Sequence, residues 1–594
     1  MKILLTVDNP DVLASDFLEL GVIRKVPRSL EESPRLLLEA IVEHHASAMI
    51  AYRRPSEDLL SDWQHAVGQP IHVAYVVGAE NATHSTQIGT SRIPDTSIES
   101  IALALQNIER DHARKTTPQP SEPVAPRKRA VLIGAGIVNL VTALHLETEG
   151  FDVHVLEASP EPGGDWHDYG CTHAGDDARM FTFTEMDGYG NQSFTGSSSD
   201  VFRKPVLSGG WNALARPLRQ SERDWMTEFE RIPSWLARTY TDDVLALNAE
   251  AYLLWLELFE KIPAIFEGSV LRHDILRLYS DANQLNAARQ RHVRIGALTQ
   301  ELDEIELARQ YPALKPPIAH GLIAGGLLVP GFTVNIHKFA NHLVSYLRER
   351  GVRFSWNSPV RTVKRDDEGT VTTFDSSVPI DQTAHVVASP GTDRFHLLDG
   401  SACEGKIHGV IGGWMRIANK ASLNTSLKLA RKGHRTEDAN ITVATDLTGE
   451  ETLIVGSGYG YVGEGPTVPD SVQLDAMRTG IEDTVRNYFP DAPYRARPET
   501  GDDYGFKYCV RPWTSTSLGI FHSETMSNGG IYVITGGHNT GGFAQAPAIA
   551  AAVAARLSGR EHPMHWMYHP DRFTNLAPSP FSEQDRAHAI GVLL

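Results

Sequence analysis

The chain has 594 residues with ordinary hydrophobic (41%) and charged (22%) fractions, enough for roughly three or four domains of about 150 residues each. Its formal net charge of −18 opposes binding to nucleic acid or to an anionic membrane surface, and no basic run is longer than 127–129. The three cysteines (Cys171, Cys403 and Cys509) are widely spaced, which argues against a disulfide framework and favours a cytoplasmic location. No stretch approaches the ~18 uninterrupted apolar residues that a membrane-spanning helix needs.

Residues 1–112 alternate strand-like and helix-like segments, from ILLTV at 3–7 to the amphipathic IESIALALQNIERDH at 98–112. This alternation predicts a small flavodoxin-like α/β domain with a parallel sheet. The segment resembles the outer domain of D-2-hydroxyacid dehydrogenases, whose catalytic residues lie elsewhere, so the resemblance implies no catalytic residue here. We expect a docking or dimerisation module, through which the chain could form a homo-oligomer. Residues 113–128, rich in proline, threonine and charge, are expected to be a linker.

A dinucleotide-binding motif opens at Arg129, where a buried strand, a glycine turn, a helix and a second strand follow one another. Gly134 permits the tight turn, and Gly136 has no side chain to keep a pyrophosphate from the positive N-terminus of the helix. Glu157 closes the second strand, where an acid accepts hydrogen bonds from the adenosine ribose. The third glycine position is occupied by Asn139, a departure that weakens the motif, and the motif alone does not separate NAD from FAD.

The motif GAGIVNLVTALHLETEGFDVHVLEA at 134–158, followed by DYGCTHAG, resembles the start of the D-amino-acid oxidase and glycine oxidase (DAO) superfamily of flavoproteins. Similar segments follow in order to the C-terminus, and together they select FAD. They lie at 296–314, 325–354, 385–398, 508–521, 531–557 and 569–573.

The resemblance implies a mixed α/β and α+β fold, in which a Rossmann-type FAD-binding domain carries an inserted antiparallel-sheet substrate domain. We expect the FAD-binding domain at 129–200, 331–395 and 505–560, the substrate domain at 201–330 and 396–504, and a C-terminal tail at 561–594. The expected flavin contacts are Gly134, Gly136, Asn139, Glu157, Gly164, Asp165, Trp166, Gly391, Gly537, Asn539, Thr540, Gly541 and Gly542. The glycine-rich turn in the last motif leads into a helix whose N-terminus would stabilise the negative charge of a reduced flavin.

Arg511 stands where the superfamily places the arginine that holds the substrate carboxylate, a task suited to its planar fork. The family often follows this position with Thr-Pro-Asp, whereas residues 514–516 read Thr-Ser-Thr. Tyr459 and Tyr461 alternate along one expected strand, so both could roof the pocket, although hydrophobic packing explains them equally well. Cys509 lies near the cysteine to which sarcosine oxidases of this family attach their flavin, with the register off by about two residues.

Three histidines near the C-terminus do not predict a metal site. His562, His565 and His569 have no accompanying thiolate, and Pro563 disfavours one continuous helical face. We therefore expect a solvated tail and no metal.

Three functions remain open at this stage. The first is an FAD-dependent oxidase or dehydrogenase that acts on the C–N bond of an amino acid or related amine. The second is an N-monooxygenase of a small amino acid such as aspartate, of the nitrosuccinate-forming type, with NADPH as reductant; no second glycine fingerprint for a nicotinamide is present. The third is a non-enzymatic flavin-bearing scaffold.

Overall fold

The computed structural model describes residues 1–15, 18, 21–68, 70–76, 89–116, 128–162, 178–186, 201–205, 210–211, 216–393, 395–430, 439–445, 449–465, 471–492, 506–570 and 572. The chain divides into two compact units. One comprises Met1–Gln119, Arg231–Thr239 and His565–Leu594, and the other comprises Pro120–Glu230 and Tyr240–Met564.

The first unit is built on a five-stranded parallel sheet with strand order β2-β1-β3-β4-β5. Its strands are β1 (Ile3–Leu5), β2 (Ile23–Lys25), β3 (Ala48–Ala51), β4 (His72–Val76) and β5 (Gly89–Ile93). Its helices are α1 (Pro10–Leu13), η1 (Arg28–Glu32), α3 (Pro34–Glu43), α4 (Glu57–Val67) and α5 (Ile98–Thr116). This strand order is the flavodoxin-like one, so the predicted N-terminal α/β domain is confirmed. Helix α5 continues beyond the predicted boundary at residue 112.

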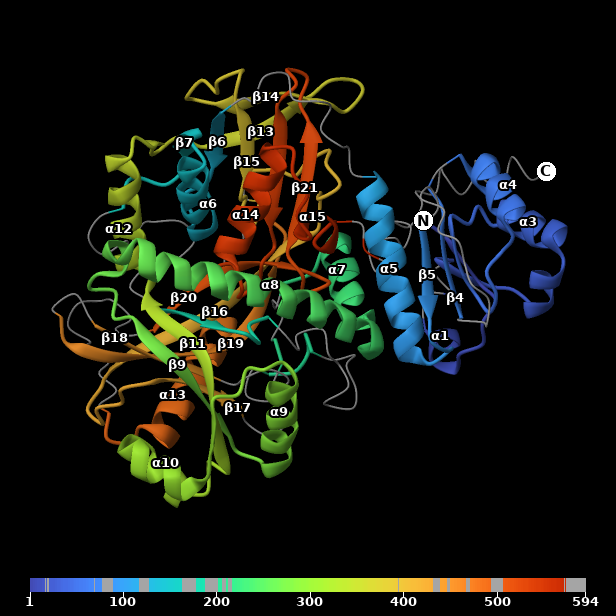
Figure 1. The fold of residues 1–594 in the computed structure, drawn as a ribbon. Coiled ribbons are helices and arrows are strands. Elements are labelled where there is room, and N and C mark those ends of the chain that lie inside the picture. The colour runs from blue at the N-terminus through green and yellow to red at the C-terminus, as the bar shows by residue number, and fades with distance from the viewer. Residues whose placement is uncertain are drawn as a thin grey trace. The chain divides into compact units, whose positions relative to one another are not determined.

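A six-stranded sheet in the second unit carries the dinucleotide motif. Its order is β12-β7-β6-β15-β22-β21, and only the edge strand β21 is antiparallel to its neighbour. The strands are β6 (Arg129–Ile133), β7 (Asp152–Leu156), β12 (Arg353–Ser355), β15 (His385–Ala388), β21 (Ile520–Thr525) and β22 (Ile531–Gly536). Helices α6 (Ile137–Thr148) and α14 (Ala546–Leu557) pack side by side although they are far apart in the sequence (Figure 1).

The second unit also contains a nine-stranded sheet, which is antiparallel except where β9 pairs with β17. Its order is β10-β11-β9-β17-β18-β19-β16-β20, and β8 also pairs with β11. The strands are β8 (Ala178–Thr182), β9 (Arg272–Tyr279), β10 (Gln300–Leu302), β11 (Gly325–Asn335), β16 (Ile407–Ala418), β17 (Ser426–Ala430), β18 (Ala439–Thr445), β19 (Glu451–Gly463) and β20 (Phe506–Thr514).

The two faces of this sheet have different neighbours. On β18, the apolar side chains Ile441 and Val443 pack into a core shared with Ile481 and Val485 of α13 (Ser471–Tyr488). Because side chains alternate along a strand, the residues between them point to the opposite face. That opposite face borders the cavity described below.

The remaining elements complete the described chain. They are α7 (Gln220–Arg231), α8 (Ser234–Lys261), η4 (Pro263–Phe266), α9 (Ala282–Arg294), α10 (Glu304–Gln310), η5 (Pro312–Leu314), α11 (Lys315–Ala319), α12 (Ile336–Glu349), the hairpin of β13 (Val360–Arg365) and β14 (Val371–Ser376), and α15 (Met564–Met567). Within the described ranges, no helix combines the length and the apolarity that crossing a membrane requires.

The structure differs from the sequence-based expectation in two places. The expected boundaries assign β8, β20 and residues 331–335 of β11 to the FAD-binding domain, yet all three segments hydrogen-bond into the nine-stranded sheet. The expected solvated tail is also wrong for its first part, because His562, His565 and His569 are all buried. His562 Nε2 lies 2.8 Å from Glu250 Oε1, and His569 Nε2 lies 3.3 Å from Glu109 Oε1, so acidic side chains of neighbouring helices account for two of the three.

Candidate active site

The glycine turn after β6 is open to a ligand. Gly134 adopts a φ of +95°, and a Cβ there would lie 3.0 Å from the carbonyl oxygen of Ser389. Gly136 caps α6 without any side-chain hydrogen bond, and a Cβ at this position would meet no atom within 4 Å. Gly136, Ile137 and Val138 line a cavity, so the N-terminal amides of α6 face open space that suits a pyrophosphate.

The side chain of Asn139 stabilises the turn in place of the usual third glycine of the motif. The side chain is fully buried, and its Nδ2 donates to the carbonyl oxygens of Ile133 (2.9 Å) and Gly134 (2.8 Å). Its Oδ1 accepts a hydrogen bond of 2.9 Å from the Ser389 hydroxyl, just beyond β15. Asn139 therefore ties the turn to the neighbouring strand from behind and does not line the cavity.

Glu157 is held in place by backbone amides. Its Oε2 accepts from Ala135 N–H (2.6 Å), and its Oε1 accepts from Ser159 N–H (2.8 Å). Each carboxylate oxygen keeps a further lone pair, so the group can still accept ribose hydroxyls. Together with the open position at Gly136, this arrangement fits the dinucleotide portion of FAD.

The cavity has a volume of about 370 Å³, and the described residues that line it come from both sheets of the second unit. The dinucleotide side contributes Ala135, Gly136, Ile137, Val138, Leu140, Ser389 and Gly391. The end of β22 and the segment after it contribute Thr535, Gly536, His538, Asn539, Thr540, Gly542 and Phe543. The nine-stranded sheet contributes Gly413, Trp414, Asn440, Thr442, Ile454, Gly456, Tyr459, Cys509, Val510, Arg511 and Pro512. Met180, Glu185, Ile336, His337 and Ala340 complete the wall.

The sequence-predicted residues fall into three groups. Gly136, Gly391, Asn539, Thr540, Gly542, Tyr459 and Arg511 meet at the cavity. Gly134, Asn139, Glu157, Gly537, Gly541 and Tyr461 do not line it. Gly164, Asp165 and Trp166 lie outside the described residues.

Two glycines of the closing motif are required by close packing. A Cβ on Gly537, where φ is +64°, would lie 2.5 Å from Thr514 Cγ2, and a Cβ on Gly541 would overlap the sulfur of Met186. Asn539 joins this segment to the end of β20, because its N–H donates to Pro512 O (2.9 Å) and its Nδ2 to Ser517 O (2.6 Å). The unusual Thr-Ser-Thr stretch is buried in this junction.

Sequence reasoning missed His538, which lies inside the closing motif and lines the cavity. Its Nε2 is 3.1 Å from the Thr535 hydroxyl, and burial lowers its pKa to about 3. The ring is therefore neutral at physiological pH. Its position between the paired glycines of GGHNTGG is the signal that could have identified it.

Arg511 extends from β20 across its neighbour β16. A Cβ on Gly412, the residue of β16 that pairs with Cys509, would overlap Arg511 Nη1, so the guanidinium lies directly on the bare backbone. Its Cζ is 5.8 Å from the ring centroid of Tyr459. Nη1 is buried and has no hydrogen-bond partner among the described residues. The pair Gly412-Gly413 inside a strand is the signal that sequence reasoning overlooked, since glycine in a strand often marks a close approach.

Tyr461 belongs to a different environment from Tyr459. It is fully buried, its hydroxyl lies 2.6 Å from His408 Nδ1, and its ring packs 5.2 Å from that of Trp225. Burial raises the pKa of Tyr461 well above its usual range and lowers that of His408 to about 3. Tyr461 therefore supports the wall behind Tyr459 and does not reach the cavity.

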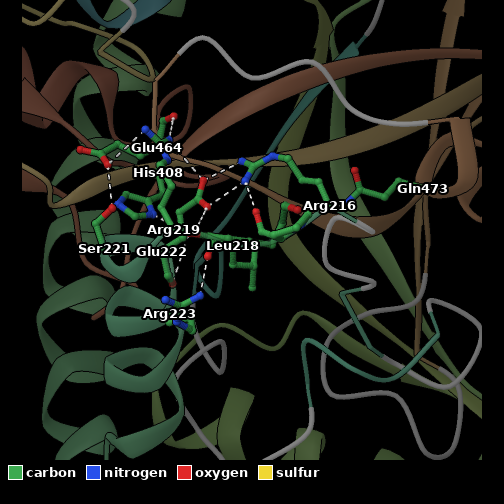
Figure 2. Close-up of polar contacts among 11 residues, drawn as sticks. Arg216, Leu218, Arg219, Ser221, Glu222, Arg223, His408, Glu464 and Gln473 are labelled. Atoms are coloured by element: carbon green, nitrogen blue, oxygen red, sulfur yellow. Dashed lines mark hydrogen bonds and ion pairs between the residues drawn. The ribbon is translucent and has the colours of Figure 1, made fainter.

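A buried carboxylate anchors this supporting cluster. Figure 2 shows Glu222 between Arg216 and Arg219, near His408 and Glu464. Arg216 donates to both carboxylate oxygens (2.7 and 2.9 Å), and the Arg219 N–H donates at 2.8 Å. Burial raises the pKa of Glu222, but the hydrogen bonds from Arg216 and Arg219 outweigh it and bring the pKa down to about 2. The cluster is thus a charged clamp between the start of α7 and the end of β19.

The sequence is similar to a known protein family and to a curated protein. The family model "FAD dependent oxidoreductase" (DAO) matches residues 129–556. A curated relative, D-amino acid dehydrogenase 3 of Mesorhizobium japonicum, is 24% identical over 286 residues, which are 46% of this chain and 59% of the relative. The chain thus spans less than two thirds of that relative's length.

The structure is similar to solved structures at low sequence identity. Glycine oxidase from Geobacillus kaustophilus superimposes with a TM-score of 0.47 at 16% identity, covering 73% of this chain and 96% of that one. A fructosyl peptide oxidase superimposes with a TM-score of 0.50 at 14% identity, covering 75% and 93%. The expected mixed fold, an FAD-binding domain with a substrate-binding sheet, is confirmed. The chain belongs to the DAO family of FAD-dependent oxidoreductases.

Proposed function

We propose that this protein oxidises the C–N bond of an amino acid or related amine. The observation that carries the proposal is the position of Arg511, whose buried Nη1 has no partner among the described residues and lies in the wall of the cavity that also contains the dinucleotide turn. A buried cationic donor without a partner favours an anionic ligand. The name of the curated relative, a D-amino acid dehydrogenase, supports the same substrate class.

The chain's own residues would bind and orient the reactants. Gly136 and the N-terminal amides of α6 would hold the pyrophosphate, and Glu157 the ribose. Bound FAD would supply the hydride acceptor. Arg511 would hold the substrate carboxylate, with Gly412 below it and Tyr459 beside it fixing the guanidinium. A substrate that arrives with a neutral amine would need no protein base.

The apolar part of the cavity wall would exclude water from the reacting atoms. Trp414, Ala444, Ile454 and Cys509 form one buried cluster on the cavity side of the nine-stranded sheet. Shielding of this kind strengthens the electrostatic contact between Arg511 and a carboxylate.

An anaerobic reduction experiment tests the proposal. The purified holoenzyme is mixed first with a panel of D- and L-amino acids and N-substituted amines, and then with NADPH, while the flavin absorbance is followed. Bleaching by an amine alone supports C–N oxidation. Bleaching by NADPH alone, accelerated by an amino acid, would overturn it in favour of N-monooxygenation, and no bleaching by either would favour a scaffold.

Replacement of the carboxylate anchor gives a sharper test. Arg511→Ala should raise KM on the order of 100-fold, because a charge-assisted bidentate contact contributes about 2–3 kcal/mol. Flavin content should stay unchanged. Arg511→Lys keeps the charge but loses the fork, so its KM should lie between those of the wild type and Arg511→Ala. An unchanged KM in both variants would show that the carboxylate is bound elsewhere.

For the N-terminal unit we propose docking or dimerisation. Light scattering of the full-length protein over a range of concentrations tests the dimerisation part. A monomer at every concentration would leave docking of another protein as the role of this unit.

A further inference from the structure

The cavity continues past Arg511 along the nine-stranded sheet. Gly412, which lies under the guanidinium, and Trp414 are two residues apart on β16 and therefore share a face, with their Cα atoms about 7 Å apart. The register places Gly456 opposite Trp414 and Asn440 opposite Gly456. Trp414, Gly456 and Asn440 all line the cavity. A ligand held by Arg511 would thus meet these three residues next.

Gly456 leaves a depression between its two neighbours. A Cβ at this position would lie 3.5 Å from Gly413 O, 3.7 Å from Trp414 Cβ and 3.9 Å from Asn440 O. These are ordinary van der Waals distances, so the protein itself leaves room for a side chain at residue 456. The space over Gly456 is consequently available to a ligand.

The walls of the depression offer hydrogen-bond donors. Trp414 is only 4% exposed, and its Nε1 is buried without a hydrogen-bond partner among the described residues. An indole N–H left in this state costs about 1–3 kcal/mol, which an acceptor on a ligand would recover. On the other side, Asn440 is an exposed residue whose amide can also donate.

We propose that the space over Gly456 binds the substrate side chain, and that this side chain ends in a carboxylate or carboxamide received by Trp414 and Asn440. The inference rests on the proposed function, because Arg511 fixes where the side chain begins. The spacing of about 7 Å between Gly412 and Trp414 suits a side chain of two or three carbons. The one carboxylate in the described wall, Glu185, is neutralised by Lys428 at 2.7 Å and does not oppose an acidic group.

Redox-inert carboxylates test the inference without turnover. Dissociation constants are measured from the change in flavin absorbance of the holoenzyme on titration with succinate, succinamate, glutarate, butyrate or valerate. We expect succinate, succinamate and glutarate to bind at least about 10-fold more tightly than the monocarboxylates of matching length. Equal or weaker binding of the compounds with a second polar group would overturn the inference.

Two variants of cavity residues and one control variant test whether Trp414 and Gly456 cause these differences in ligand affinity. Trp414→Phe removes the N–H and keeps an aromatic ring, so it should weaken succinamate binding about 5- to 10-fold and leave butyrate binding unchanged. Gly456→Ala should weaken all ligands of four or five carbons but not acetate, because the methyl group fills the depression. The control Trp225→Phe removes an indole N–H that donates to Lys406 O outside the cavity, and it should not change the ratio of succinamate to butyrate affinity.

The possible outcomes distinguish a failure of this inference from a failure of the proposed C–N oxidation. If amines bleach the flavin but Trp414→Phe weakens butyrate and succinamate equally, the side-chain site is refuted and C–N oxidation stands. If no carboxylate perturbs the flavin and no amine bleaches it, both proposals fall. The comparison of ligands on the unaltered protein decides the matter even if a variant does not fold.

Discussion

At the residue scale, the contact between Arg511 and Gly412 is the feature on which the site most depends. Gly412→Ala would place a methyl group where Arg511 Nη1 now lies, so the guanidinium must move off the β16 backbone. We expect KM to rise at least about 10-fold with little change in flavin content, since misplacement of about 1 Å in a positioning group can cost 100-fold in rate. Steady-state kinetics with an active amine measures the effect.

A matched glycine separates this effect from simple crowding. A Cβ on Gly460 would lie 2.9 Å from both Ile411 Cγ1 and Met477 Cε, on the side of β19 that faces α13. Gly460→Ala should therefore lower stability without raising KM. If both variants raise KM to the same extent, the position of Arg511 is not what Gly412 protects.

Asn139 provides a second test at this scale. Asn139→Gly restores the usual glycine of the motif, yet it removes the hydrogen bonds to Ile133, Gly134 and Ser389. Because these groups lie in the interior of the turn, we expect a loss of about 2 kcal/mol or more in unfolding free energy and an earlier thermal release of flavin. Thr148→Ala, which removes one hydrogen bond to Leu144 O on the same helix, should have a much smaller effect. A more stable Asn139→Gly variant would contradict this account.

At the scale of elements, the clamp in Figure 2 fixes helix α7 to the end of β19. Glu222→Gln removes the buried anion that Arg216 and Arg219 share, and we expect a loss of about 1–3 kcal/mol in unfolding free energy, measured by urea unfolding. The folded-state pKa of about 2 lies below the usual 4.5, so this stabilisation is present above pH 4.5 and is lost as the pH falls toward 2. Glu464→Gln, at a partly exposed member of the same network, should cost less. Equal losses would show that burial of Glu222 is not what matters.

Some elements of the fold could be predicted from the sequence and others could not. The unit of β6, α6 and β7 was predictable because its period, its glycines and its closing acid are all local. The sheet to which β8 and β20 belong was not predictable, because a strand shows the same alternation of buried and exposed residues in either sheet. The same limit applies to Tyr459 and Tyr461, whose shared face was predictable although only Tyr459 reaches the cavity. Gly412 escaped notice because its partner, Arg511, lies far along the chain.

At the scale of the whole molecule, three buried histidines predict sensitivity to acid. Burial lowers the pKa of His292 to about 2, with Arg277 and Arg291 adding to the effect, and lowers those of His408 and His538 to about 3. Because the unfolded chain binds these protons near pH 6.5 and the folded chain does not, stability falls as the pH drops below 6.5. Each unfolded histidine goes from half to almost fully protonated between pH 6.5 and 5.5, which costs about 1 kcal/mol, so the three together remove about 3 kcal/mol. Urea unfolding across this range measures the loss.

A single variant tests the origin of this acid sensitivity. Neither ring nitrogen of His292 has a hydrogen-bond partner among the described residues, so His292→Leu removes a titrating group and no hydrogen bond. The loss of unfolding free energy between pH 6.5 and 5.5 should become smaller by about 1 kcal/mol. An unchanged slope would mean that other groups dominate.

The strand order of the flavin sheet also determines when the cavity can form. Strand β6 (129–133) pairs with β15 (385–388), which in turn pairs with β22 (531–536), and the cavity wall closes only with Thr540, Gly542 and Phe543. A chain growing from its N-terminus must therefore keep both sheets incomplete until almost all of it has been synthesised. Contacts between segments so distant in sequence make folding slow and expose strand edges meanwhile. FAD can bind only near the end of this process, so we expect a shortage of flavin to appear first as a lower yield of folded protein.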